Sequence, residues 1–374
     1  MKKLLIACIL IYSIHGAAQQ SDSIASAISV DASYIGDFVY NVHGGIQQGA
    51  AFLGMASLGI MLETNKLGLW KDGTLYIHGK SLHGKSPSAN LVGDFQVISN
   101  IDGGEHSYLH ECWYSQSFQN IHVTVGLQDA NVELATSELG SHFINSSFGI
   151  PSLIANNVPT PIFPLTNVGV TIKAQLHKKV DVVAALYDGK PTHFDINRYN
   201  TDWELQKEDG VLSFVEFQYS SSQSNMYKLG YFNHSGLQEF NDSTRNFEQV
   251  FSRNYGLYGI ADYILWSNIE QEKSLGIFTQ IAASPKSINR HSMYVGGGLV
   301  YTGIGVARSV LGLAIAHARF NNKTSETAIE ASYKAHIFSN VSIQPDVQYI
   351  IHPMGNEKRI PHALAGILRV IVEL

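Results

Sequence analysis

The chain has little charge, cysteine or proline and few long apolar runs, and each shortage excludes a class of protein. Its 374 residues are 15% charged and 45% apolar, whereas soluble proteins carry about 25% charged side chains. Cysteine occurs only at Cys8 and Cys112, which excludes a disulfide scaffold and a Cys-rich metal site. The net charge is −6 without a basic stripe, so nucleic acid is not an expected partner. No apolar run after Gln20 is long enough for a transmembrane helix.

The first residues have the pattern of a secretory signal peptide. Lys2 and Lys3 precede an apolar core, Leu4–Ile14, and the small residues Gly16–Ala18 follow it. We therefore predict a signal peptide over residues 1–18 and a short periplasmic lead-in over 19–32. An exported, apolar chain without a transmembrane helix favours an outer-membrane β-barrel.

Period-two alternation then recurs in segments of about ten residues, which is typical of barrel strands. Because short and long connections alternate, residues 33–374 are predicted to form one all-β domain, a transmembrane antiparallel β-barrel of about 16 strands. The expected strands are Ser33–Gly49, Ala51–Leu62, Thr74–Gly84, Ser107–Phe118, Ile121–Gln128, Asn167–His177, Val180–Tyr187, Val211–Ser220, Met226–Asn233, Tyr255–Trp266, Lys273–Ala282, Ser292–Tyr301, Val310–Phe320, Glu326–Ile337, Val341–Ile350 and Pro361–Leu374.

Each expected strand divides into an apolar face and a polar face, and alternation assigns the polar face to the lumen. The charged residues predicted to face the lumen are Lys80, Glu111, Glu216, Lys228, Asp346 and Arg369. One connection, Asp129–Pro164, is too long for an ordinary loop in a compact domain. We predict that it folds into the barrel as a constriction loop.

Several stretches resemble the carbohydrate-selective porins of the OprB type. They are Glu111–Tyr114 with Gln116, Gly126–Asn131, Phe143–Gly149, Pro161–Pro164, Gly169 and Leu186–Pro191, with Gly44-Gly45 and Leu69–Thr74 before them and Ile343–Tyr349 and Gly366–Arg369 after them. The resemblance implies a sixteen-stranded barrel with inward loops that passes monosaccharides and related sugars by diffusion. The chain departs from the family pattern at Tyr108, where an Arg is common, and at Ser115, where an acid is frequent. It also ends in Leu374 rather than an aromatic residue.

A sugar site needs hydrogen-bonding side chains for the hydroxyls and an aromatic surface for the C–H face. In the predicted constriction Glu111, Asp129 and Glu133 could accept hydrogen bonds, and Lys80 and Arg369 could donate them. Trp113 shares the parity of Glu111 and could supply the aromatic face, and Asn131 and Asn145 could do either polar task. Glu111 could instead belong to a lumen ion-pair network, and Asp129 and Asn131 could serve mainly as turn residues.

The remaining signals do not indicate an enzyme. No nucleophile elbow or paired-carboxylate motif is present, and the sixteen histidines match no metal-binding spacing. The sequence therefore predicts no catalytic residue, no cofactor and no metal, but an outer-membrane porin for passive sugar diffusion. A non-selective porin is the alternative, followed by a barrel enzyme or adhesin and by a soluble β-sandwich. The expected partners are sugars and outer-membrane lipid, with a monomer or a homotrimer both open.

Overall fold

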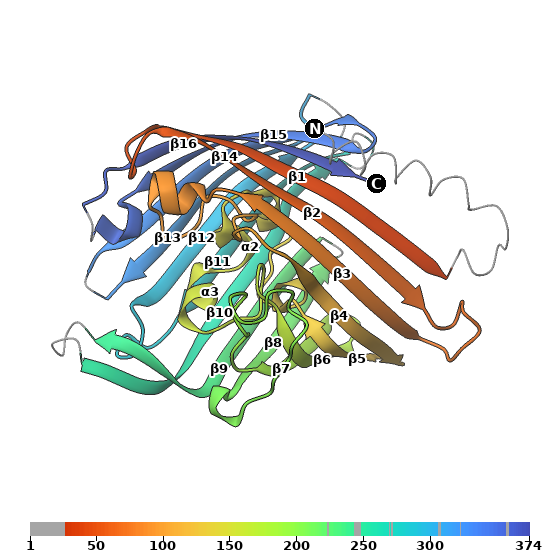
Figure 1. Cartoon of the computed structure of the whole chain (residues 1–374). Coiled ribbons are helices and arrows are strands. Elements are labelled where there is room, and N and C mark those ends of the chain that lie inside the picture. The colour runs from red at the N-terminus through yellow and green to blue at the C-terminus, as the bar shows by residue number, and fades with distance from the viewer. Residues whose placement is uncertain are drawn as a thin grey trace.

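The computed structural model describes residues 27–222, 224–242, 248–268, 270, 272–305, 308–321, 323–356 and 359–374. Sixteen strands run through these residues and wrap around a common interior (Figure 1). The strands are β1 (Ile28–His43), β2 (Gly49–Glu63), β3 (Gly73–Gly84), β4 (Ser107–Phe118), β5 (Ile121–Gln128), β6 (Asn167–His177), β7 (Val180–Asp188), β8 (Val211–Ser222), β9 (Asn225–Asp242), β10 (Glu248–Asn268), β11 (Lys273–Ala283), β12 (His291–Thr302), β13 (Val310–Phe320), β14 (Ser325–Phe338), β15 (Val341–Ile351) and β16 (Ala363–Glu373).

The sheet closes on itself because the first strand pairs with the last. β1 and β16 are antiparallel, with Asp37 opposite Arg369, and every other strand pairs with its neighbours in sequence. Closure satisfies the backbone groups of the edge strands, which a hydrocarbon environment requires because it offers no water. The predicted fold class, an all-β antiparallel transmembrane barrel of about sixteen strands, is confirmed.

Alternating residues on each strand separate an outer apolar face from an inner face. On β13 the side chains of Leu311, Leu313 and Ile315 are exposed on the outside, whereas Ala314 and Ala316 are buried inside. The predicted lumen charges follow the same rule, because Glu216, Asp346 and Arg369 are buried on the inner face. An apolar exterior is the surface that the hydrocarbon region favours.

The largest differences from the predicted strand boundaries are in β1, which ends at His43 rather than at Gly49, and in the hairpin of β9 and β10. β1 begins at Ile28, so the end of the predicted lead-in 19–32 is strand. β9 and β10 extend to Asp242 and back to Glu248, so most of the expected loop 234–254 is a paired hairpin. The prediction depended on the alternation of apolar and polar residues. Backbone hydrogen bonds between neighbouring strands continue beyond the segments in which this alternation is visible, so β9 and β10 are longer than predicted. The predicted signal peptide 1–18 and the residues up to 26 lie outside the described residues.

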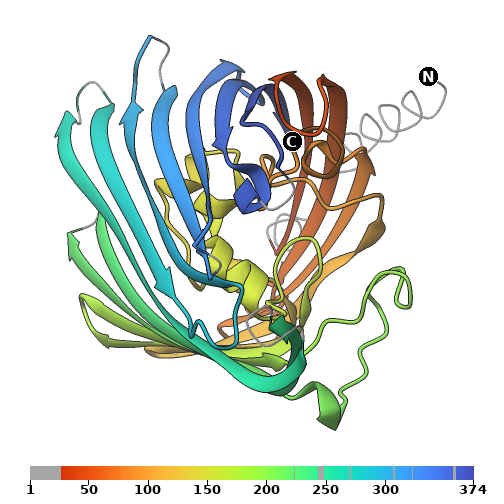
Figure 2. The ribbon, with the colours of Figure 1, turned by 90° about the vertical axis from the view of Figure 1, so that its left-hand side faces the viewer.

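Two long connections pack inside the barrel. The connection between β5 and β6 carries four short helices, and Figure 2 shows the yellow ones within the ring of strands. The connection 85–106 between β3 and β4 also turns inward, and its Val92 and Ile98 are fully buried. The expected strands Thr74–Gly84 and Ser107–Phe118 left residues 85–106 as a long connection, but their alternation did not predict that it turns inward. The short helices are η1 (Ser88–Val92), η2 (Ala130–Val132), η3 (Gly140–His142), α2 (Ser146–Gly149), α3 (Ser152–Asn157), η4 (Lys207–Asp209) and η6 (Pro353–Asn356).

Within these described ranges, no helix is both long enough and apolar enough to cross a membrane.

Candidate functional site in the barrel lumen

A β-bulge on β4 sets the inner surface of this part of the barrel. His78 of β3 pairs with Glu111, but the next residue, Gly79, pairs with Leu109, so His110 is an extra residue on β4. A bulge shifts the alternation by one position. His110 and Glu111 are therefore both buried although they are adjacent in sequence.

Glu111 is the centre of a hydrogen-bonded group on the inner wall. Its Oε1 accepts a hydrogen bond from Trp113 Nε1 at 3.1 Å, and its Oε2 lies 3.5 Å from His78 Nδ1. The Trp113 ring packs against the Tyr76 ring with 5.2 Å between centroids. The inward side of β3 and β4 therefore offers a carboxylate beside an aromatic pair.

Asp129 fixes the start of the long loop. Its carboxylate accepts hydrogen bonds from the backbone N–H groups of Asn131 at 2.9 Å and Phe163 at 3.3 Å, which joins the two ends of the loop. His110 Nε2 lies 3.3 Å from the same carboxylate. Burial raises the pKa of Asp129, but the hydrogen bond from His110 and the Lys80 ammonium outweigh burial and hold that pKa below its ordinary value. The carboxylate is therefore an anion at neutral pH.

Lys80 and Glu133 are charged residues that remain partly open to the lumen. The Lys80 ammonium lies over the Phe163 ring, 5.1 Å from its centroid, in a cation–π contact. Glu133 pairs with Lys173 of β6 at 3.1 Å, and both side chains keep at least a third of their surface exposed. Charged groups of both signs thus face the interior near the loop root.

Asn131 and Asn145 hold the loop in place. Asn131 Nδ2 donates to the backbone carbonyls of Leu134 at 3.3 Å and Gly149 at 3.4 Å. Asn145 is fully buried; its Nδ2 donates to Gln348 Oε1 at 3.0 Å, and its backbone N–H donates to Glu330 Oε2 at 2.9 Å. The contacts of Asn145 are those of an anchor between loop and wall.

Arg369 lies on β16 and is neutralised by Asp37. The guanidinium donates to both carboxylate oxygens at 2.7 and 2.8 Å and also to Asn100 Oδ1 at 2.8 Å. Ser99 Oγ donates to the same carboxylate at 2.7 Å. Arg369 therefore binds the inward connection 85–106 to the wall, a task the sequence did not indicate.

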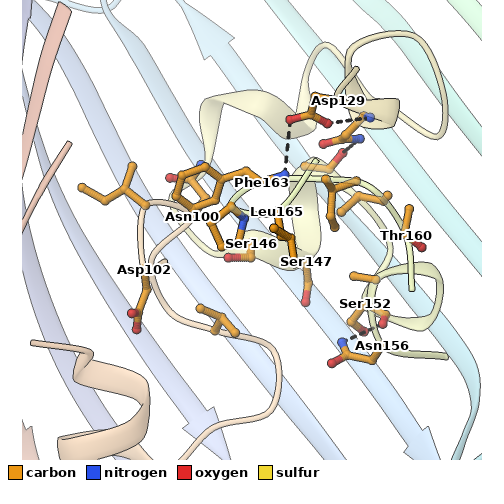
Figure 3. A pocket seen from close by; sticks show the side chains of 18 of the residues that line it. Asn100, Asp102, Asp129, Ser146, Ser147, Ser152, Asn156, Thr160, Phe163 and Leu165 are labelled. Atoms are coloured by element: carbon orange, nitrogen blue, oxygen red, sulfur yellow. Dashed lines mark hydrogen bonds between the residues drawn. The ribbon is translucent and has the colours of Figure 1, made fainter. Parts of the chain in front are cut away.

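Two of the cavities in the structure adjoin the loop root. The larger, about 1180 Å³, extends from the loop between β7 and β8 to Glu373 and includes Lys80, Asn131 and Arg369. Figure 3 shows the polar side chains on its wall, including Asn100, Asp102 and Ser146. The smaller, about 500 Å³, lies over β4–β7 and includes Glu111, Trp113 and Glu133. Asp129 lines both cavities, and Asn145 lines neither of them.

The sequence did not single out several residues of these walls. Lys173, His122 and Tyr187 line the smaller cavity, and Tyr187 exchanges a hydrogen bond with Thr171 at 3.0 Å. Inward parity could have found Lys173 and His122, because each lies between two apolar neighbours, whereas Tyr187 lies between Leu186 and Asp188. His78 shares the inward parity of Lys80 on β3, whereas His110 could not be found in this way, because the bulge on β4 is not visible in the sequence.

A closed barrel of sixteen antiparallel strands with polar cavities inside and an apolar exterior defines the porin class of membrane channels. The model of the carbohydrate-selective porin, OprB family, matches residues 47–374. The chain belongs to this family, and it is a porin of the outer membrane through which sugars diffuse. Family and fold indicate a channel rather than an enzyme.

Solved structures share this fold at low sequence identity. The high-pH structure of Pseudomonas putida OprB is 17% identical over 96% of each chain, with a TM-score of 0.86. Its low-pH structure is 15% identical over 94% of this chain and 93% of that chain, with a TM-score of 0.60. OmpT of Vibrio cholerae, in a trimer form, is 8% identical over 93% and 99%, with a TM-score of 0.53. Among curated proteins no match is found.

Proposed function

We propose that sugars pass from one lumen cavity to the other beside Asp129, and that the loop 129–164 narrows the passage there. The observation that carries this proposal is that Asp129 lines both cavities. Its carboxylate is fixed by two backbone N–H groups of the loop. A fixed acceptor at the junction of two cavities can contact each molecule that crosses.

The chemistry around Asp129 suits a neutral, hydroxyl-rich solute. Glu111 and Asp129 can accept hydrogen bonds from sugar hydroxyls, and Lys80 can donate them. Trp113 and Tyr76, packed at 5.2 Å, offer an aromatic surface to the C–H face of a sugar ring. Because binding must be weak for a solute to leave the channel, a few such contacts are sufficient.

A non-selective porin remains the second candidate, because the lumen carries charges of both signs near the loop root, Glu133 beside Lys173 among them. Such a channel would conduct ions and small solutes without preferring sugars. The further proposals are export by the N-terminal signal peptide, a Gram-negative outer membrane as the destination, and a monomeric or trimeric barrel in lipid. A barrel enzyme or adhesin has no motif in its favour.

The test is single-channel conductance of the refolded barrel in a planar bilayer, titrated with glucose and then with a disaccharide. We expect stepwise openings that glucose blocks at millimolar concentration. Trp113→Leu should weaken the block severalfold, because it removes aromatic surface from the proposed passage. Trp266→Leu is the matched control, since Trp266 is an exposed tryptophan paired with Leu275 on the outer face of β10.

Two outcomes would change the proposal. Openings that are indifferent to sugar in the unaltered protein would favour the non-selective porin. Equal block in Trp113→Leu and Trp266→Leu would remove Trp113 and its surroundings from the sugar path.

A further inference from the structure

Three side chains at the bulge of β4 lie close enough to hold a metal ion. His78, His110 and Glu111 each offer one ligand atom, and these atoms lie within 4.8 Å of one another. A tetrahedral zinc site requires ligand atoms about 3.3 Å apart, given bonds of about 2.0 Å. His78 Nδ1 and Glu111 Oε2 are already 3.5 Å apart, so small side-chain rotations would complete the set.

Each of the two imidazoles leaves one ring nitrogen without a partner. His78 Nε2 and His110 Nδ1 are buried, and neither has a hydrogen-bond partner among the described residues. The His110 side chain is only 2% exposed. A buried nitrogen lone pair without a donor is costly to desolvate, and a cation bound at His110 Nδ1 would satisfy the lone pair of that nitrogen.

Asp129 provides the support that metal-binding histidines usually have. Its carboxylate lies 3.3 Å from His110 Nε2, so this nitrogen carries the proton and Nδ1 keeps its lone pair. A carboxylate behind a ligating histidine fixes the ring orientation and raises the basicity of the ligand. Asp129 is itself fixed by the backbone of the loop.

We propose that His78, His110 and Glu111 bind a divalent transition-metal cation of the zinc type, with Asp129 orienting His110. Two nitrogens and one oxygen are the donor set that zinc accepts in sites that keep a fourth position open. Calcium and magnesium prefer oxygen ligands and are not expected to bind. Both Glu111 and Asp129 line lumen cavities, so the ion has a route from solution.

The spacing of His78, His110 and Glu111 in the sequence matches no metal motif. Strand pairing places His78 opposite Glu111, and the bulge turns His110 to the same side. The ligands therefore come together only through the register of β3 against β4.

The positive charge of Lys80 should repel the bound cation, and this repulsion leads to a second prediction. Its ammonium interacts with the charges of both Asp129 and Glu111. Binding of a dication near this ammonium costs electrostatic energy. Removing the charge with Lys80→Met should therefore tighten metal binding, which a purely structural histidine cluster would not show.

The experiment is isothermal titration calorimetry of the refolded, untagged full chain with zinc chloride, with calcium chloride as the comparison. We expect one zinc ion per barrel at micromolar affinity and no calcium binding. His110→Ala should abolish binding, and Asp129→Asn should weaken it about 10- to 100-fold. His83→Gln is the matched control, because His83 lies on β3 with its ring stacked against the exposed Tyr34. Heat-modifiable migration on gels confirms that each variant is folded.

The visible spectrum of the cobalt-loaded barrel gives an independent readout of nitrogen ligation. Intense absorption that is lost in His110→Ala and retained in His83→Gln would support the site. Absence of saturable zinc binding to the unaltered barrel, or unchanged affinity in His110→Ala, would overturn it. Whether bound zinc also reduces conductance rests on the proposed function, whereas calorimetry tests the metal site alone.

Discussion

Asp262 of β10 is an anchor of the inward loop, and its replacement by Asn should loosen one segment of that loop. The Asp262 carboxylate is buried and accepts three hydrogen bonds from consecutive loop residues. Ser137 Oγ donates at 2.5 Å, and the backbone N–H groups of Glu138 and Leu139 donate at 3.1 and 3.4 Å. The Asn side chain has the same shape, but one of its two terminal atoms is a donor.

The magnitude follows from the bonds that the amide cannot make. With the amide nitrogen in place of Oδ2, the Glu138 N–H meets another donor and loses its acceptor. A hydrogen bond to a charged group contributes about 1.5–3 kcal/mol. The population of the locally released segment should therefore rise about 10- to 150-fold.

Hydrogen exchange measured by mass spectrometry reads this population directly. In Asp262→Asn we expect the protection of residues 137–139 to fall by that factor, whereas the Asn145 amide, held by Glu330, stays protected. Asp181→Asn is the control, since Asp181 lines the smaller cavity and makes no hydrogen bond to the loop among the described residues. Unchanged protection at 137–139, or an equal fall in the control, would refute the reasoning.

Two further predictions concern the other inward connection, 85–106. Arg369→Met leaves the buried Asp37 carboxylate unpaired and should lower the free energy of unfolding by about 3–5 kcal/mol, measured by denaturant titration of the refolded barrel. The double variant Asp37→Asn/Arg369→Met should recover most of that loss, and a single variant as stable as the original chain would contradict the assignment. Burial raises the pKa of Asp94 to about 6, above its value in the unfolded chain. The protonated carboxyl therefore stabilises the folded state at low pH, and this stabilisation is lost as pH rises through about 6. Corrected hydrogen-exchange protection of residues 88–102 should therefore be about tenfold higher at about pH 5 than at about pH 7.5, and Asp94→Asn should remove this dependence.

The local pattern of apolar and polar residues was sufficient to predict the barrel fold. Alternation with a period of two separates a lipid face from a lumen face within a single strand, as Leu311 and Ala314 of β13 illustrate. The number of alternating segments then predicts the number of strands. All sixteen strands were expected, and the hairpin of β9 and β10 was underestimated because polar residues continue its pairing. These features depend on neighbours in sequence, so the sequence alone could determine them.

The arrangement of side chains in the lumen depends on contacts between residues far apart in the chain. Only the tertiary structure could show which side chains are in contact there. Asn145 was expected at a sugar site but is fully buried against Gln348 and Glu330. Arg369 was expected to donate hydrogen bonds to a sugar, but its guanidinium is paired with Asp37, which closure of the barrel places opposite it. The bulge at His110 brings His110 and Glu111 to the same side as His78. Alternation predicts which face a side chain takes, but its partner there depends on strand register and on where two long connections settle inside the barrel.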